Sequence, residues 1–301
     1  MPSLRFCALA LAALLTPAPA FSAEYSCADC DSWNAPHAPF RIHGNTWYVG
    51  TQGLSALLVT SDRGHVLIDG GLPQSAPRIA ASIAALGFRL GDVKLILNSH
   101  AHFDHAGGIA ELARLSGATV AASPYSAGQL RNGNPDDAQF GRSAPYPALA
   151  KVREIADVEV LRVGDLAMTA HFTPGHTTGG TSWTWRSCEG ARCLNMVYAD
   201  SLTAPGFRLL GNPRQPEAVA QFRGSFARVA ALPCDILVSP HPDFSDLFEH
   251  LAAREAGQAE AFIDAGACRR YAAAARARFE AQLAREQAAP PAPAEASGKR
   301  P

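Results

Sequence analysis

One stretch near position 100 constrains this chain most, because it places three histidines and an aspartate directly behind an apolar run. The run at 93–97 has the composition of a buried strand, and the residues after it read Asn-Ser-His-Ala-His-Phe-Asp-His. Side chains alternate along extended backbone, so His100 and His102 point the same way, while Asp104 and His105 lie on the turn beyond. This geometry predicts a site for two metal ions at the carboxyl end of a strand.

The main alternative is that these are ordinary loop histidines. The chain has ten histidines in 301 residues, so chance can place two of them together. Chance seldom produces the pattern His-x-His-x-Asp-His directly behind a buried strand. The sequence therefore favours the metal-binding interpretation.

Two further histidines follow predicted strands in the second half of the chain. His176 stands in the turn Thr-Pro-Gly-His behind a strand at 168–172, and His241 follows a strand at 235–238. A single histidine after a strand is usually an ordinary loop residue. Here both stand at strand ends, and the first cluster needs additional ligands, so we interpret both as metal ligands.

Apolar periodicity divides the chain into two similar halves of strands and helices. Their strand ends meet at one edge if two sheets lie face to face with helices outside. We therefore expect an α/β fold with two mixed sheets and the metal site at their shared edge. The predicted strands are 40–42, 46–49, 55–60, 65–69, 93–97, 157–173, 181–187, 194–199 and 235–239, and the main predicted helices are 77–86, 109–115 and 216–232.

Both ends of the chain differ in composition from the region between them. Residues 1–23 combine Arg5, a short apolar run and small residues at a cleavage site, which predicts a secretory signal peptide and a periplasmic protein. The apolar run is shorter than the roughly 20 residues that span a bilayer, and no later segment is predicted to cross one. Residues 288–301 are rich in alanine and proline, which predicts a disordered tail after one domain at 24–287.

Charge composition limits the partners. The formal net charge is −1, 18% of residues are charged, and no cluster of lysine and arginine occurs, which argues against a nucleic-acid surface. The sequence also shows no sign of an obligate protein partner. We therefore expect a small molecule as the main binding partner.

Six of the seven cysteines remain after the predicted signal, in a compartment that permits disulfides. Cys188 and Cys193 flank a four-residue loop that a hairpin could bridge. Cys27 and Cys30 form a Cys-x-x-Cys pair, for which a local disulfide or unpaired thiols fit better than a redox or metal motif. Six cysteines permit fifteen pairings, so the connectivity stays open. Cys234, before a predicted strand, and Cys268, at the start of a predicted helix, complete the set.

The histidine and aspartate pattern resembles the metallo-β-lactamase superfamily, and the full set resembles its subclass B3. Two other subclasses carry a cysteine ligand where this chain has Ser201, and one of them replaces the first histidine by asparagine. The resemblance covers nearly the whole predicted mature chain, from Ser32-Trp33 to Cys268-Arg269-Arg270-Tyr271. It implies an αββα sandwich, disulfides Cys234–Cys268 and Cys188–Cys193, and two zinc ions, one on His100, His102 and His176 and one on Asp104, His105 and His241.

The same resemblance implies roles for residues around the metals. Ser201 and Thr203 would hydrogen-bond the substrate carboxylate, although a strand cap is the alternative for Thr203. Trp33 would form a wall of the cleft, or alternatively an N-terminal staple. An aspartate at the position of Asp200 bridges two metals in glyoxalase II and lactonase relatives, whereas in the lactamases that bridge is absent. Asp69 is expected to orient ligands without touching metal.

The implied activity is hydrolysis of the β-lactam amide of penicillins, cephalosporins and carbapenems, which confers antibiotic resistance. Zinc lowers the pKa of bound water to about 7 and so supplies a hydroxide nucleophile. Asp104 would bind metal through one oxygen and use the other to orient the hydroxide and relay a proton. A secreted hydrolase of lactones or thioesters, and a zinc-binding protein without catalysis, are the alternatives.

Overall fold

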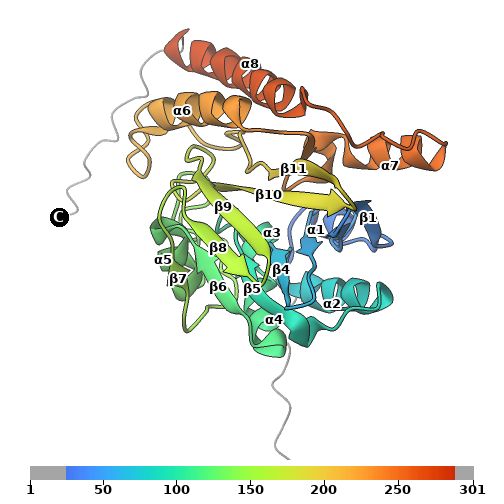
Figure 1. The fold of residues 1–301 in the computed structure, drawn as a ribbon. Helices are drawn as coiled ribbons and strands as arrows, with labels where there is room; N and C mark the ends of the chain where they lie inside the picture. The colour runs from blue at the N-terminus through green and yellow to red at the C-terminus, as the bar shows by residue number, and fades with distance from the viewer. Residues whose placement is uncertain (1–24, 289–301) are drawn as a thin grey trace, which may run out of the picture.

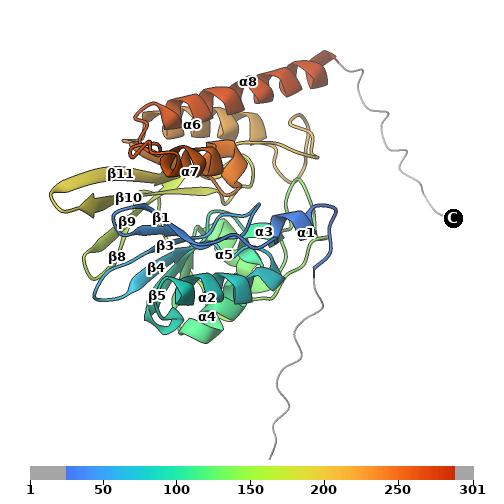
Figure 2. The same cartoon turned by 90° about the vertical axis from the view of Figure 1, so that its right-hand side faces the viewer.

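The computed structural model describes residues 25–288 and arranges them in four layers, with two β-sheets face to face and helices on both outer sides (Figures 1 and 2). The predicted αββα sandwich is confirmed. The predicted signal peptide at 1–23 lies outside the described residues, as do residues 289–301 of the predicted tail. The helices are α1 (Cys30–Trp33), α2 (Ala76–Ala85), α3 (Phe103–Ala106), α4 (Ile109–Ser116), α5 (Pro124–Asn132), α6 (Ala218–Ala231), α7 (Leu247–Glu255) and α8 (Ala267–Ala288), with 3-10 turns η1 (Pro73–Ser75), η2 (Leu90–Asp92) and η3 (Pro242–Ser245).

The larger sheet contains seven strands in sequence order. Its first four strands pair antiparallel, and the pairings from the fourth to the seventh are parallel, so the sheet is mixed as expected. The strands are β1 (Phe40–His43), β2 (Thr46–Tyr48), β3 (Leu57–Val59), β4 (His65–Ile68), β5 (Val93–Leu97), β6 (Thr119–Ala122) and β7 (Arg153–Glu154).

The smaller sheet contains five strands in the order β12-β11-β10-β9-β8. The pairing of β11 with β12 is parallel and the others are antiparallel. Its helices α6, α7 and α8 lie on the face away from the larger sheet (Figure 2). The strands are β8 (Val160–Val163), β9 (Leu166–Phe172), β10 (Thr181–Glu189), β11 (Arg192–Tyr198) and β12 (Ile236–Val238).

Side-chain alternation explains why the larger sheet can be covered on both faces. In β3, Leu57 packs between the sheets, whereas Leu58 packs against the outer helices. In β5, Leu97 faces the other sheet and Ile96 faces the helices. These strands are therefore continuous apolar runs, and β5 places Asn98 and the ligand motif that follows at the edge where the two sheets meet.

Several elements differ from the sequence prediction. Strands β6 and β7 and helix α5 were not predicted, although Ser123 accepts a hydrogen bond from the backbone N–H of Ser126 and Pro124 occupies the first helical turn. The strand predicted at 157–173 is a hairpin of β8 and β9 whose turn places Gly164 at φ +56°. The alanine-rich residues 119–122 carry too weak an apolar signal to mark a strand by periodicity.

Three disulfides fasten this framework. Cys234 pairs with Cys268 and Cys188 with Cys193, as the resemblance implied. Cys27 pairs with Cys30, which is the local disulfide among the alternatives left open. In the described part of the chain, no helix is both long enough and apolar enough to cross a membrane.

Candidate metal centre

Three buried histidines form a first donor set at the shared edge of the sheets. His100 and His102 follow β5, and His176 follows β9 from the other sheet. One ring nitrogen of each lies within 4.8 Å of the others. The ring centroids of the three pairs are 4.7 to 4.8 Å apart. Three imidazoles that converge in this way can hold one metal ion and leave a fourth position open.

A second donor set adjoins the first. Asp104 Oδ2 lies 3.2 Å from His105 Nε2 and 3.3 Å from His241 Nε2. The rings of His105 and His241 are 4.9 Å apart, and donor atoms of His100, Asp104 and His105 lie within 4.8 Å of one another. Asp104 and His105 belong to α3, whereas His241 follows β12 of the other sheet. The fold thus brings the six sequence-predicted ligands together in two adjoining sets.

The outer hydrogen bonds of the imidazoles fix which nitrogen faces the centre. His100 Nδ1 contacts Asp200 at 2.8 Å and His102 Nε2 contacts Asp137 at 2.5 Å. His176 Nδ1 and His241 Nδ1 each contact a backbone carbonyl, of Thr203 at 2.8 Å and of Gly53 at 3.1 Å. The other nitrogen of each ring is left for the centre. Such outer partners orient ligand rings and set their tautomers.

The electrostatics suit a cation. Burial, reinforced by neighbouring imidazoles, lowers the pKa of His100 well below its ordinary value and lowers that of His176 to about 3. Burial alone would raise the pKa of Asp104, but His105 and His241 hold it well below its usual range. His100 and His176 are therefore neutral and Asp104 is ionised, which is the state that metal binding requires.

Unpaired polar atoms provide a test of whether a metal fits. Among the described residues, His100 Nε2, Asp104 Oδ1 and both ring nitrogens of His105 are buried without a hydrogen-bond partner. A buried polar atom without a partner costs about 1–3 kcal/mol. His100 Nε2, one ring nitrogen of His105 and the Asp104 carboxylate can each donate a lone pair, so the residues fit a metal ion.

The two donor sets open into a cleft of about 870 Å³. The aromatic part of the cleft wall consists of Trp33, Phe140 and Phe244. The same cleft is lined by Ser201, Thr203 and His176. The far wall is formed by residues of α8. A cleft of this size can bury a drug-sized molecule next to the metal centre.

The sequence model of the Metallo-beta-lactamase superfamily matches residues 49–241. The chain belongs to the metallo-β-lactamase superfamily. The matched region includes every residue of both donor sets, so membership extends to the metal-binding site itself.

Solved structures of this superfamily resemble the whole described fold. The Rm3 metallo-beta-lactamase is 54% identical with a TM-score of 0.84, and the match covers 87% of this chain and 100% of that one. MEM-A1, a subclass B3 metallo-beta-lactamase isolated from a soil metagenome library, is 54% identical with a TM-score of 0.82, covering 85% and 99%. The predicted membership of subclass B3 is thereby confirmed.

A curated relative of another activity is more distant. The hydroxyacylglutathione hydrolase of Anaeromyxobacter dehalogenans is 32% identical over 236 residues, which are 78% of this chain and 74% of that protein. The chain is therefore related to a hydroxyacylglutathione hydrolase, but it is more similar to the metallo-beta-lactamases.

Two aspartates in this metallo-β-lactamase lie behind the ligands, and Asp69 has the orienting role expected for it. Asp69 is fully buried and accepts hydrogen bonds from the backbone and hydroxyl of Ser99, from Asn98 and from Tyr198, so it orders the ligand-bearing loop and contacts no ligand ring. Asp200 orients His100 through the ring nitrogen that faces away from the centre. A carboxylate in that position does not bridge the two donor sets.

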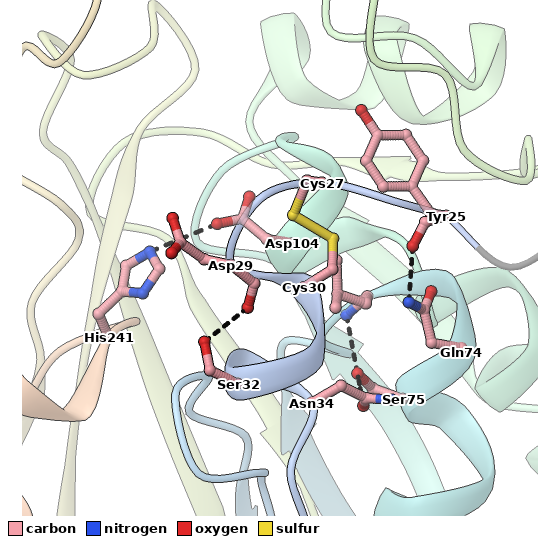
Figure 3. The surroundings of a disulfide bond; sticks show 11 residues. Tyr25, Cys27, Asp29, Cys30, Ser32, Asn34, Gln74, Ser75, Asp104 and His241 are labelled. Atoms are coloured by element: carbon pink, nitrogen blue, oxygen red, sulfur yellow. Dashed lines mark hydrogen bonds and ion pairs between the residues drawn. A yellow bond between two sulfur atoms is a disulfide. The ribbon is translucent and has the colours of Figure 1, made fainter.

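The N-terminal arm, residues 25–34, covers the second donor set. The Tyr25 ring stacks on Phe103 at 4.3 Å, next to Asp104, and the Trp33 ring lies 5.1 Å from that of His241. Figure 3 shows the Cys27–Cys30 disulfide on this arm, beside Asp104 and His241. Trp33 therefore forms part of the cleft wall.

Sequence reasoning missed several residues that support the site. Asp137 lies in a loop between α5 and β7 and orients His102, and the carbonyl of Gly53 orients His241. Phe244, in η3, lines the cleft. A single aspartate or a backbone carbonyl carries no local pattern, so only their place in space identifies them. For Phe244 the sequence contains one indication of a place in the site, because it lies three residues after a ligand at a strand end.

Proposed function

We propose that this protein is a zinc-dependent β-lactamase that hydrolyses the ring amide of penicillins, cephalosporins and carbapenems and so confers resistance to them. The observation that carries this proposal is the pair of adjoining donor sets at the floor of an open cleft. The 54% identity to the Rm3 metallo-beta-lactamase, over the whole of that chain, supports it.

We propose two zinc ions as the cofactor. His100, His102 and His176 would hold one, and Asp104, His105 and His241 the other. Five imidazoles and one carboxylate suit zinc, whereas calcium and magnesium prefer oxygen donors. The converging distances around Asp104 Oδ2 support the second ion.

The chain's own residues prepare the reaction around these ions. Bound zinc supplies a Lewis acid and a water of lowered pKa. Asp104 uses Oδ2 toward His105 and His241, so its buried Oδ1 is free to accept and pass on a proton. Ser201 and Thr203 have hydroxyl groups on the cleft wall and would hydrogen-bond the substrate carboxylate. The aromatic side chains of the wall would displace water from this space when a substrate binds.

The alternative of lactone or thioester hydrolysis depended on Asp200 as a bridge between metals. Its contact with His100 Nδ1 and its full burial place it behind the first donor set. We further propose that residues 1–23 are a signal peptide that directs the protein to the periplasm, that residues 24–287 form one domain, and that its partner is the small-molecule substrate alone.

The test is loss of ultraviolet absorbance of a carbapenem on addition of the purified mature protein. We expect hydrolysis that stops after chelation by EDTA and returns with zinc. Replacing His102 or His241 with alanine should reduce the rate by several orders of magnitude, whereas His250→Ala, at a residue of α7 that does not line the cleft, should leave it unchanged. A folded protein that holds two zinc ions and cleaves no β-lactam would refute the proposal.

A further inference from the structure

The C-terminal helix α8 presents one face to the cleft. Ala275, Arg278, Gln282 and Arg285 are spaced by three or four residues, which places them on the same side of a helix. All four line the cleft that contains the metal ligands. Tyr271, one turn earlier on this face, donates a hydrogen bond to the carbonyl of Asp200 at 2.9 Å. This contact anchors the wall to the segment that carries Ser201 and Thr203.

Arg278 has a defined position on this wall. Its guanidinium carbon lies 5.7 Å from the centroid of the Phe244 ring, in a cation–π contact. Phe244 belongs to η3, directly after His241, and its ring centroid is 6.1 Å from that of His241. The Phe244 ring is thus a neighbour both of the guanidinium and of a ligand of the second donor set.

The charge of Arg278 lacks a partner within the described part of the chain. Two other arginines of the outer layer are paired, since Arg223 contacts Glu280 at 2.9 Å and Arg270 contacts Asp264. No carboxylate of residues 25–288 lies within 4 Å of the Arg278 guanidinium. Phe244 beneath it keeps 44% of its surface exposed although it is a large apolar side chain. An unpaired cation held on an exposed ring at a cleft wall is suited to bind an anionic ligand.

We propose that Arg278 is a specificity-determining residue that binds the carboxylate on the ring system of the β-lactam. This inference rests on the proposed function and names a contact beyond the hydroxyls of Ser201 and Thr203. Phe244 positions the guanidinium and limits its freedom, so less entropy is lost when the anion binds. The carboxylate takes no part in ring opening, so its contact with Arg278 is the same before and after the chemical step. Loss of this contact therefore changes substrate affinity more than kcat.

The test compares Arg278→Ala with wild-type zinc-loaded protein on a cephalosporin. We expect KM to rise about 5- to 20-fold at low salt, the range for a partly exposed charged hydrogen bond, with kcat within about twofold. The increase should shrink in 1 M NaCl, where the Debye length is about 3 Å. Arg278→Lys should restore part of the affinity, and Arg276→Ala, on the same helix but outside the cleft, should leave KM unchanged.

Two further substrates identify the carboxylate that Arg278 binds. With the neutral methyl ester of the same cephalosporin, Arg278→Ala and wild type should have the same KM. An equal KM effect on acid and ester would overturn the proposal, as would an effect confined to a penicillin with a second carboxylate on its acyl side chain. Binding of the ring-opened cephalosporin, followed by tryptophan fluorescence, gives the same comparison without turnover.

The proposed function can fail separately from this inference. If wild-type protein cleaves no β-lactam, the proposed function is wrong and the kinetic comparison cannot be made. If wild type cleaves the cephalosporin and Arg278→Ala has an unchanged KM at low salt, the lactamase stands and the role of Arg278 is refuted.

Discussion

At the scale of single residues, the geometry of the metal centre depends on the groups that orient the ligands as much as on the ligands themselves. Each imidazole of the first donor set has an outer partner, which is Asp200, Asp137 or the carbonyl of Thr203. These partners hold the rings with one nitrogen toward the centre before any metal binds. A preorganised site loses less entropy on binding, so metal affinity depends on them.

Replacing Asp137 with asparagine should therefore weaken metal binding. The amide can still accept the hydrogen bonds that Asp137 Oδ1 receives from Gln139 and Phe140, but the charged contact to His102 is lost. We expect zinc affinity of the first donor set to fall about 10- to 100-fold, measured by competition with a chromophoric chelator. The control is Asp136→Asn, whose side chain pairs with surface arginines and should leave affinity unchanged. Equal affinities of the two variants would contradict this role for Asp137.

At the scale of elements, the N-terminal arm and the loop after β2 are fitted closely together. Gly53 donates its backbone N–H to the carbonyl of Trp33, and its own carbonyl accepts from His241. A Cβ atom at Gly53 would lie 2.5 Å from Trp33 Cδ1 and 2.8 Å from Trp33 Cα. A side chain here must therefore displace the arm, the loop or both.

Replacing Gly53 with alanine tests this coupling. We expect a loss of about 1–3 kcal/mol of unfolding free energy from the steric clash, measured by urea denaturation. Because the loop also orients His241, the second zinc should bind more weakly than the first in stepwise metal titration. The control is Gly128→Ala in α5, where a Cβ meets no atom within 4 Å, and where loss of glycine should stabilise the helix by about 0.5–1 kcal/mol. Unchanged stability and unchanged zinc binding in Gly53→Ala would show that the arm is not coupled to the site.

At the scale of the whole molecule, the metal centre connects the two halves. One donor set draws ligands from both sheets, through His100 after β5 and His176 after β9, and the other does so through His105 and His241. Bound metal therefore links parts of the chain that unfolding would separate. Anything that binds only the folded state stabilises it by RT ln(1 + L/Kd), where L is the free ligand concentration.

Metal removal should accordingly lower the stability of the fold. At free zinc 1,000 times above the dissociation constant, binding contributes about 4 kcal/mol, which corresponds to roughly 10 °C in Tm for a chain of this size. Differential scanning calorimetry with zinc and with EDTA measures the shift. The double variant His102→Ala, His241→Ala should show a much smaller shift, since it lacks one ligand of each set. A Tm that does not respond to EDTA in wild type would contradict this linkage.

The ligands themselves were predictable from the sequence because each follows a strand and four belong to one short motif. Strand ends, the turn glycines and the apolar runs are local features, so periodicity locates most of β3, β5, β10, α2 and α4. The family resemblance added the division of the ligands into two sets. The subclass follows from local identity as well, since Ser201 stands where other subclasses carry cysteine.

Only the tertiary structure decided which groups stand behind these ligands and beside the cleft. Asp200 and Asp69 end strands of different sheets and look alike in sequence, yet one orients His100 and the other holds Ser99. Arg278 lies more than a hundred residues from the ligand motif, and its approach to Phe244 depends on how α8 packs on the smaller sheet. Local patterns determine strands, turns and donor types, whereas partners distant in the chain are set by packing, which no local pattern encodes.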